Sequence, residues 1–161
     1  GRAYADAILA AEIEFDVLFG PAYKGIPIAV ATATALAEQG VHVGVAYNRK
    51  EAKDHGEGGQ LVGADVAGRV LLVDDVLTSG KAIRQSVDLI VQTQARIVGA
   101  VIALDRAELF DGGVTAVEAL AGDLGVPILS IASVTDIIRH VADATLRQRM
   151  VEYQQQYCRV S

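Results

Sequence analysis

Two adjacent aspartates follow an apolar run of four residues near the middle of the chain. The segment Val70–Ala82 reads VLLVDDVLTSGKA, so Asp74 and Asp75 stand at the end of a predicted buried strand, and residues 76–80 lead into a predicted helix. Neighbouring carboxylates can accept hydrogen bonds from sugar hydroxyls and can help to hold a divalent cation. Hydroxyls and converging backbone N–H groups at the start of a helix bind phosphate. An Asp pair alone is more often a helix cap, but the whole string favours a site for a phosphorylated sugar.

A second candidate is a charged, glycine-rich segment at residues 48–63. Its first part reads NRKEAKDHGEGG and carries the cationic or titratable residues Arg49, Lys50, Lys53 and His55. Glycines make a single fixed conformation unfavourable, and cations on such a loop suit a lid that closes over an anionic leaving group and stabilises its developing charge. Because three acidic residues nearly cancel this charge, composition alone fits a solvated hairpin equally well.

Two further candidates follow other predicted strands. Residues 20–25 read GPAYKG, and two glycines with Pro21 give a backbone that can expose N–H groups beside Lys24. Arg106 ends the run Ala-Leu-Asp-Arg. Taken alone, a tight turn and an ordinary surface charge are the simpler interpretations of these two segments.

The elements that must position these residues form a regular alternation. We expect strands over residues 16–19, 43–47, 69–73, 97–104 and 126–132, helices over residues 3–11, 26–39, 81–93, 115–124, 133–141 and 144–157, and a long loop over residues 48–63. The strands are apolar throughout, which is typical of a parallel sheet covered on both faces. We therefore predict an α/β fold with an open, mainly parallel twisted sheet and helices on both faces, in a single domain over residues 1–161. In such sheets ligands bind beyond the carboxyl ends of the strands, where the polar candidates lie.

Composition narrows the possible functions. Of 161 residues, 52% are hydrophobic and 21% are charged, which is enough apolar material for a core and excludes a disordered chain. The net charge of −6 argues against nonspecific nucleic-acid binding. No apolar run reaches membrane-spanning length, so we expect no membrane association. Cys158 is the single cysteine, which rules out an internal disulfide and favours a reducing, cytoplasmic setting.

The string at Val70–Ala82 resembles the motif that binds 5-phosphoribosyl 1-diphosphate (PRPP) in type I phosphoribosyltransferases, whose core has the fold predicted above. The segment 48–63, through its final QLVG, resembles the catalytic loop of one branch, the orotate phosphoribosyltransferases. The resemblance implies that Asp74 and Asp75 hold the ribose hydroxyls. It also implies that a loop wraps the 5-phosphate, formed by Val76, Leu77, Thr78, Ser79, Gly80, Lys81 and Ala82.

The same resemblance assigns the remaining candidates. The implied contacts to PRPP and its diphosphate are Tyr23, Lys24, Arg49, Lys50, Lys53 and His55, and the implied catalytic group is Lys53, His55, Asp74 and Asp75. Thr78 and Arg106 are the implied orotate contacts, and Ala22–Tyr23 is a candidate for a cis peptide bond. The cofactor is Mg²⁺, carried by PRPP near the two aspartates without a direct protein ligand. The family also implies a homodimer in which the loop 48–63 is shared across subunits.

The implied reaction is the Mg²⁺-dependent transfer of the phosphoribosyl group from PRPP to orotate, a step of UMP and pyrimidine biosynthesis. In that family an N-terminal hood covers the base, and no residue before Phe19 matches it. We therefore expect the chain to lack the hood, a feature that concerns orotate binding and not the PRPP site. Two alternatives stay open: a phosphoribosyltransferase for another nucleobase, as in purine salvage, and a non-catalytic PRPP-binding regulator.

Overall fold

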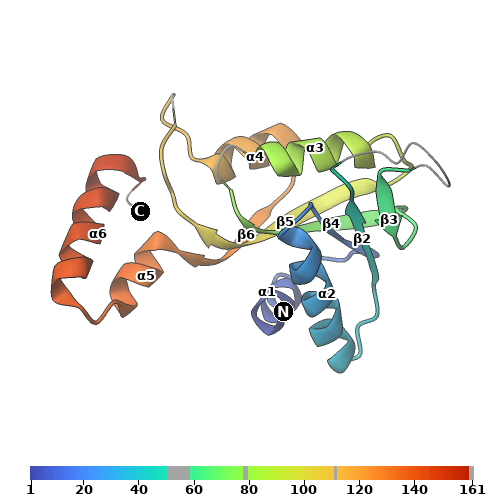
Figure 1. Cartoon of the computed structure of the whole chain (residues 1–161), viewed down its shortest axis with the longest axis horizontal. Coiled ribbons are helices and arrows are strands. Elements are labelled where there is room, and N and C mark those ends of the chain that lie inside the picture. The colour runs from blue at the N-terminus through green and yellow to red at the C-terminus, as the bar shows by residue number, and fades with distance from the viewer. Residues whose placement is uncertain (51–58, 78–79, 111, 160–161) are drawn as a thin grey trace.

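One six-stranded sheet organises the chain (Figure 1). The computed structural model describes residues 1–50, 59–77, 80–110 and 112–159. The strands are β1 (Val17–Gly20), β2 (Gly44–Asn48), β3 (Leu61–Gly63), β4 (Arg69–Val76), β5 (Arg96–Asp105) and β6 (Ile128–Ser133), in the order β3-β2-β1-β4-β5-β6. All neighbouring pairs are parallel except β2 and β3. The predicted open, mainly parallel sheet is confirmed.

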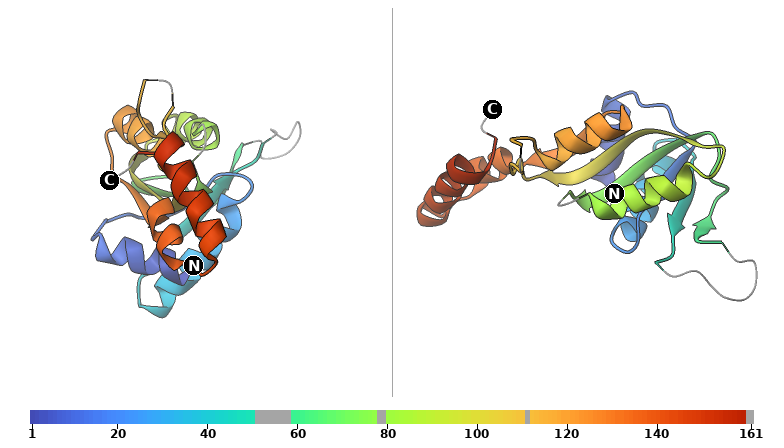
Figure 2. Two further views of the ribbon diagram at one scale, coloured as in Figure 1. Left: turned by 90° about the vertical axis from the view of Figure 1, so that its left-hand side faces the viewer. Right: turned by 90° about the horizontal axis from the view of Figure 1, so that it is seen from above.

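Helices cover both faces of this sheet, as predicted. The described helices are α1 (Arg2–Ala10), α2 (Gly25–Glu38), α3 (Lys81–Ile90), α4 (Ala116–Leu124), α5 (Val134–His140) and α6 (Ala144–Tyr157). In Figure 1, α3 and α4 lie above the sheet and α1 and α2 below it. The last two helices extend beyond the end of β6, away from both layers, and the views of Figure 2 show the same separation. Among the helices of the described part, none is long and apolar enough to cross a membrane.

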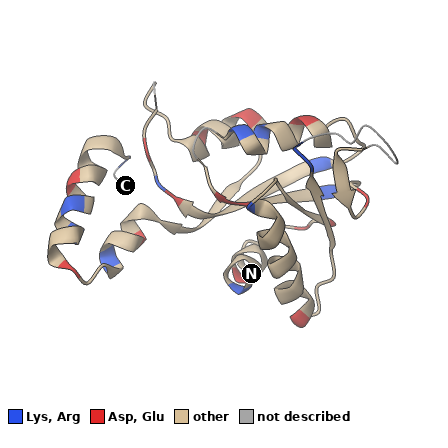
Figure 3. Cartoon of the chain, viewed as in Figure 1, with Lys and Arg blue, Asp and Glu red and all other residues tan. Residues whose placement is uncertain are grey.

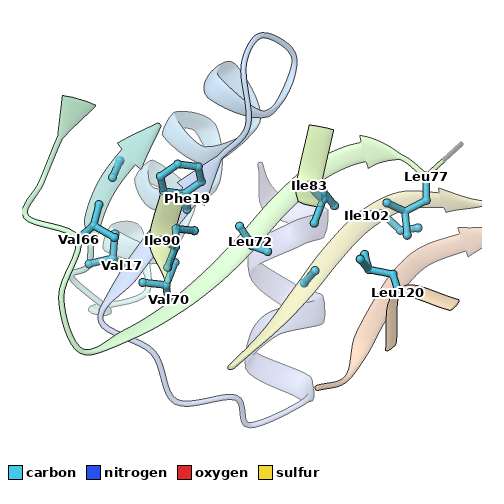
Figure 4. Packing of buried hydrophobic residues seen from close by; sticks show 12 residues of the cluster. Val17, Phe19, Val66, Val70, Leu72, Leu77, Ile83, Ile90, Ile102 and Leu120 are labelled. Atoms are coloured by element: carbon cyan, nitrogen blue, oxygen red, sulfur yellow. The ribbon is translucent and has the colours of Figure 1, made fainter. Parts of the chain in front are cut away.

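The continuous apolar runs of the strands follow from burial on two faces. Successive side chains of a strand point to opposite faces, and in β4 the residues Val70 and Leu72 belong to one buried cluster while Leu71 and Val73 belong to the other. All four are completely buried. Figure 4 shows the first cluster, which fills the space under α3 and α4 with Val17, Phe19, Val66, Val70, Leu72, Leu77, Ile83, Ile90, Ile102 and Leu120. The second cluster joins the opposite face to α1 and α2.

Several helix boundaries lie where the sequence placed them, because local capping determines them. Thr115 and Glu118 form a reciprocal capping box at the start of α4, and Gly125 ends that helix with a left-handed φ of 65°. Ser133 caps α5 in the same way. The prediction for α3 was too long, since the helix ends at Ile90 and not at Thr93. There the Thr93 hydroxyl donates to the Ile90 carbonyl at 2.7 Å and accepts from Ala95 N at 3.0 Å, which replaces further helical hydrogen bonds.

Two other sequence-based boundaries were wrong. The segment 48–63 is not a loop throughout, because its last three residues form β3, antiparallel to β2, with the adjacent Arg49 N–H donating to Gln60 O at 2.8 Å. A three-residue strand has too short an apolar pattern to detect. In addition, β4 continues to Val76, so Asp74 and Asp75 lie within the strand and not in the loop after it. Pairing with β5 extends the strand, with Asp74 opposite Ile102 and Val76 opposite Leu104.

Candidate active site

The carboxyl end of β4 presents the two predicted aspartates in different surroundings. Asp74 is buried, with 7% of its surface exposed, and its Oδ1 accepts a hydrogen bond from Asp75 N at 2.9 Å. Burial is the main cause that raises the pKa of Asp74 to about 6, and the neighbouring charge of Asp75 adds to it. At neutral pH ionisation of the buried Asp74 carboxylate is energetically unfavourable. A cationic group near this strand end would therefore stabilise the ionised form.

Asp75 has a cationic partner from a distant loop. The Lys24 ammonium forms an ion pair with the Asp75 carboxylate across 51 positions of sequence. Burial acts to raise the pKa of Asp75, but hydrogen bonds from Lys24 and the Val76 N–H, together with the charge of Lys24, lower that pKa. The same hydrogen bond raises the pKa of Lys24. The structure thus brings together a predicted sugar-binding residue and a predicted diphosphate-binding residue.

A tyrosine that sequence reasoning missed supports the same strand end. Tyr4 of α1 is buried, and its hydroxyl donates to the backbone carbonyl of Asp74 at 2.7 Å. Burial, followed by the charges of Asp74 and Asp75, raises the pKa of Tyr4 to about 12, so the hydroxyl keeps its proton and remains a donor. The sequence offered one signal for this role of Tyr4, a phenol side chain within a helix rich in alanine.

The loop at residues 20–25 is a tight structure whose ends touch. A Cβ atom on Gly20 would lie 2.2 Å from the carbonyl oxygen of Gly25, so this approach requires glycine. The peptide bond Ala22–Tyr23 is cis, which confirms that prediction. The N–H of Ala22 donates to Asn48 Oδ1 at 3.1 Å, and Asn48 also accepts from the Ser86 hydroxyl at 3.3 Å. Asn48, which the sequence did not single out, therefore ties this loop to β2 and α3.

The predicted cationic residues that the structure describes lie at this junction. Lys50 places its Nζ 4.6 Å from the centroid of the Tyr23 ring, a cation–π contact between two segments predicted to bind diphosphate. Arg49 and Lys50 line a cleft of about 690 Å³ together with Ala22 and Asp74. Lys53 and His55, the other predicted cations of this segment, lie outside the described residues.

The predicted phosphate loop forms another part of this cleft. Gly80 precedes α3 with a left-handed φ of 67°, and a Cβ there would lie 2.7 Å from Arg84 Nη1. The members of the loop that line the cleft are Val76, Leu77, Gly80, Lys81 and Ala82. The helix start of α3 therefore faces the cleft, as an anion site at a helix N-terminus requires. Thr78 and Ser79 lie outside the described residues.

Arg106 stands at the end of the neighbouring strand. Leu104 of β5 pairs with Val76 of β4, so Arg106 begins the chain segment that leaves the sheet at the same edge as the phosphate loop. Its guanidinium forms an ion pair with Glu108. Asp105 Oδ1 accepts a hydrogen bond from Ala107 N at 2.8 Å, just after the strand ends. Four of the predicted site residues do not line the 690 Å³ cleft but lie in segments at the carboxyl end of the sheet: Tyr23, Lys24, Asp75 and Arg106.

The carboxylates of Asp74 and Asp75 are oxygen donors that a divalent cation could use. In the part of the chain that the structure describes, no group of three or more His, Cys, Asp or Glu side chains could hold a metal. These two carboxylates nevertheless offer the oxygen donors that Mg²⁺ prefers, and a bound phosphate could supply further ligands. Figure 3 shows that positive and negative residues are interspersed along the described chain.

Comparison with known proteins gives consistent results. A family model described as "Phosphoribosyl transferase domain" matches residues 1–111. The chain is 54% identical over 144 residues to the orotate phosphoribosyltransferase of Pseudomonas putida (strain W619), covering 89% of the chain and 68% of that protein. It is 52% identical over 142 residues to the orotate phosphoribosyltransferase of Vibrio cholerae, covering 88% of the chain and 67% of that protein.

Solved structures show the same likeness. The orotate phosphoribosyltransferase of Francisella tularensis superposes with a TM-score of 0.83 at 33% identity, over 98% of this chain and 77% of that one. The Mycobacterium tuberculosis orotate phosphoribosyltransferase in complex with PRPP gives a TM-score of 0.67 at 25% identity, over 83% of this chain and 72% of that one. An adenine phosphoribosyltransferase from Rhodothermus marinus shares the fold at a TM-score of 0.51 and 16% identity.

Proposed function

The chain belongs to the orotate phosphoribosyltransferase family of transferases, and from this membership we propose that it catalyses the Mg²⁺-dependent reaction of PRPP with orotate to give orotidine 5′-phosphate and diphosphate. The observation that carries the proposal is the meeting of Asp74, Asp75 and Lys24 beside the cleft that the helix start of α3 lines. A sugar, a phosphate and a diphosphate each find complementary groups there. The reaction belongs to pyrimidine biosynthesis.

The two aspartates stabilise the ribose as its charge changes. In the reaction the bond from ribose C1 to the diphosphate oxygen breaks and a bond from C1 to a ring nitrogen of the base forms, while C1 gains positive character. Asp74 and Asp75 accept hydrogen bonds from the ribose hydroxyls and place negative charge near that carbon. The buried position of Asp74 strengthens this effect, because electrostatic interactions weaken less where water is excluded. No side-chain nucleophile is required.

The cations beside the cleft stabilise the leaving diphosphate. Lys24, Arg49 and Lys50 come from two segments that the Tyr23–Lys50 contact joins. Binding of diphosphate provides new anionic partners for Lys24, which is held ready by Asp75. Lys53 and His55 are assigned to the same role by the sequence. Preplaced charges of this kind lower the barrier because they need no reorganisation when charge develops.

Magnesium fits the carboxylate pair of this site. Asp74 and Asp75 would lie near an ion that PRPP carries and would hold it through water, while the substrate supplies its direct ligands. When bound, the ion neutralises charge on the diphosphate and so makes it a better leaving group. The base is assigned to Arg106 and Thr78, since a planar guanidinium pairs with a carboxylate through two hydrogen bonds. We also propose that the protein is a cytoplasmic homodimer in which the segment 48–63 serves the neighbouring subunit.

A spectrophotometric assay tests the proposed reaction. We expect the absorbance of orotate to fall when PRPP and Mg²⁺ are both present, and to stay constant when either is omitted or Mg²⁺ is chelated. Adenine, hypoxanthine and uracil offered with PRPP form the control panel. Consumption of another base without orotate consumption would replace the assigned substrate. Retained PRPP binding with no turnover of any base would instead indicate a regulator.

A further inference from the structure

Three polar side chains from two separate parts of the chain meet where β5 ends. Glu108 forms the ion pair with Arg106, and the hydroxyl of Tyr153 in α6 donates to the same carboxylate, Glu108 Oε1, at 2.6 Å. Tyr153 is 45 positions away from Glu108 in the sequence. The carboxylate of Glu108 thus links the last helix to the arginine that the proposed function assigns to the base.

Backbone pairing fixes this arrangement. Leu109 N donates to Tyr157 O at 2.8 Å, Arg159 N donates to Ala107 O at 2.7 Å, and Glu108 lies opposite Cys158 in an antiparallel bridge between these two bonds. The segment after Arg106 and the segment after α6 are therefore held together on both sides of Glu108. Since Tyr153 is one helical turn before Tyr157, its hydroxyl has a defined position relative to the carboxylate.

Glu108 and Arg106 differ in how far their side chains are exposed to solvent. The Glu108 side chain is 22% exposed, whereas the Arg106 side chain is 42% exposed. The half-buried carboxylate is held by two partners, Arg106 and Tyr153, and the guanidinium is the member that a ligand can reach more easily. The hydrogen bond to Glu108 raises the pKa of Tyr153, which keeps the phenol in its donor form. A guanidinium has five N–H donors in a rigid fork, so the bond that Nη2 donates to Glu108 leaves donors for a second carboxylate.

We propose that Glu108 and Tyr153 are positioning residues that orient the Arg106 guanidinium for the carboxylate of the base. This inference rests on the proposed function. Glu108 holds one edge of the fork, and Tyr153 holds Glu108 in place. A free arginine loses substantial rotamer entropy when a ligand orders it, so an arginine that is already oriented binds more tightly. The cluster is thereby a determinant of specificity for a base that carries a carboxylate.

Two conservative variants, Glu108→Gln and Tyr153→Phe, test the inference. Losing a hydrogen bond to a charged group typically corresponds to about a tenfold loss of affinity, and we expect the KM for orotate to rise by about that factor in Glu108→Gln and by about threefold in Tyr153→Phe. The KM for PRPP should stay within about twofold, because neither residue contacts the β4 end. The preference for orotate over uracil, which lacks the carboxylate, should fall in parallel.

Tyr157→Phe is the matched control. Its ring lies 4.9 Å from that of Tyr153 on the same helix, and the substitution leaves the three polar groups of the cluster intact. We expect unchanged values of both KM constants. A merely structural role of α6 would instead lower the melting temperature and shift the two KM constants together in all three variants.

The failures of the two proposals are distinguishable. Absence of orotate consumption by the folded wild type overturns the proposed reaction and the inference with it. Wild-type turnover with an unchanged orotate KM in both variants overturns the inference alone. A lower orotate KM in Glu108→Gln also overturns it, because Glu108 would then compete with the substrate carboxylate.

Discussion

The carboxyl ends of β4 and β5 are neighbours in the sheet but are built from different kinds of contact. At β4, one continuous segment supplies the aspartates, the loop and the helix start, and Asp74 is buried. At β5, Arg106 is half-exposed, and a partner of its ion-pair cluster comes from the last helix. The difference shows that one continuous segment supplies most of the groups at the β4 end, which Lys24 and Tyr4 reach from remote positions. The cluster around Arg106 instead requires the last helix.

The two ends also differ in the packing beneath them. β4 lies between β1 and β5, and its apolar residues contribute to both buried clusters. Among the described residues, neither cluster includes a member of α5 or α6. Elements with few buried apolar contacts open more readily. The proposed function assigns the β4 end to PRPP and the cluster near α6 to the base. We therefore expect substitutions at the β4 end to change the kinetic constants for PRPP alone, and substitutions near α6 to change those for the base alone.

Asp75→Asn is expected to have the largest effect. The substitution removes the charge that pairs with Lys24 and that is assigned to the ribose, and loss of such a preplaced group typically lowers the rate about 100-fold or more. We expect kcat/KM for PRPP to fall by about that factor while the KM for orotate changes little. Steady-state kinetics with each substrate varied in turn measures both. A comparable rise in the orotate KM would show that the two ends are not independent.

Arg106→Lys tests the β5 end with a smaller effect. Lysine keeps the positive charge but loses the planar fork that pairs with a carboxylate through two hydrogen bonds. We expect the KM for orotate to rise about 30-fold, which corresponds to about 2 kcal/mol and to one charge-assisted hydrogen bond. The KM for PRPP is the internal control and should stay within about twofold. If lysine substituted without loss, bidentate recognition at this position would be disproved.

Most of the fold was predictable because its signals are local. Apolar runs, the glycine after α4 and the capping residues Thr115 and Ser133 each act within a few positions. The strand β3 and the extension of β4 through Asp74 were missed because pairing with another strand creates them. Tertiary pairing overrides local preference in such cases.

The predictability of the site follows the same division. The string around Asp74 indicated sugar and phosphate chemistry directly, and the cis bond at Ala22–Tyr23 followed from family resemblance. Three supporting residues, Tyr4, Asn48 and Tyr153, were not predicted, since each acts through a partner 26 to 70 positions away. Nothing in the residue types near them marks such long-range contacts. No motif in the sequence of α6 indicates that this helix reaches Glu108.

Tyr4→Phe measures how much the β4 end depends on one remote contact. The variant keeps the buried ring and removes the hydroxyl that donates to Asp74 O. Loss of a neutral hydrogen bond costs about 1 kcal/mol, and we expect the free energy of unfolding to fall by about that amount and the KM for PRPP to rise about threefold. Tyr153→Phe is the mirror control, since it should change the orotate KM and leave the PRPP KM as it is. Identical profiles for the two variants would remove the distinction between the strand ends.

The adjacent carboxylates of β4 should show opposite pH dependences of stability. The pKa of Asp74 is raised to about 6 in the folded protein, so the folded state loses stability as pH rises from about 4 to 6 and the carboxylate ionises. Asp74→Asn removes that penalty and should be more stable than wild type above about pH 6, with no difference near pH 3.

The displacement of the pKa of Asp74 corresponds to about 3 kcal/mol, and we expect a stabilisation between about 1 kcal/mol and that value. Asp75 is the control of opposite sign. Its folded pKa is lowered, so its stabilising contribution is present above the unfolded pKa and is lost as pH falls through the folded value. Asp75→Asn should therefore be less stable than wild type at neutral pH. Urea titrations of both variants between pH 3 and pH 7.5 measure the two curves. If both variants changed the free energy of unfolding with the same sign, the ion pair with Lys24 would not cause the two carboxylates to differ. Burial alone would then determine the pKa values at this strand end.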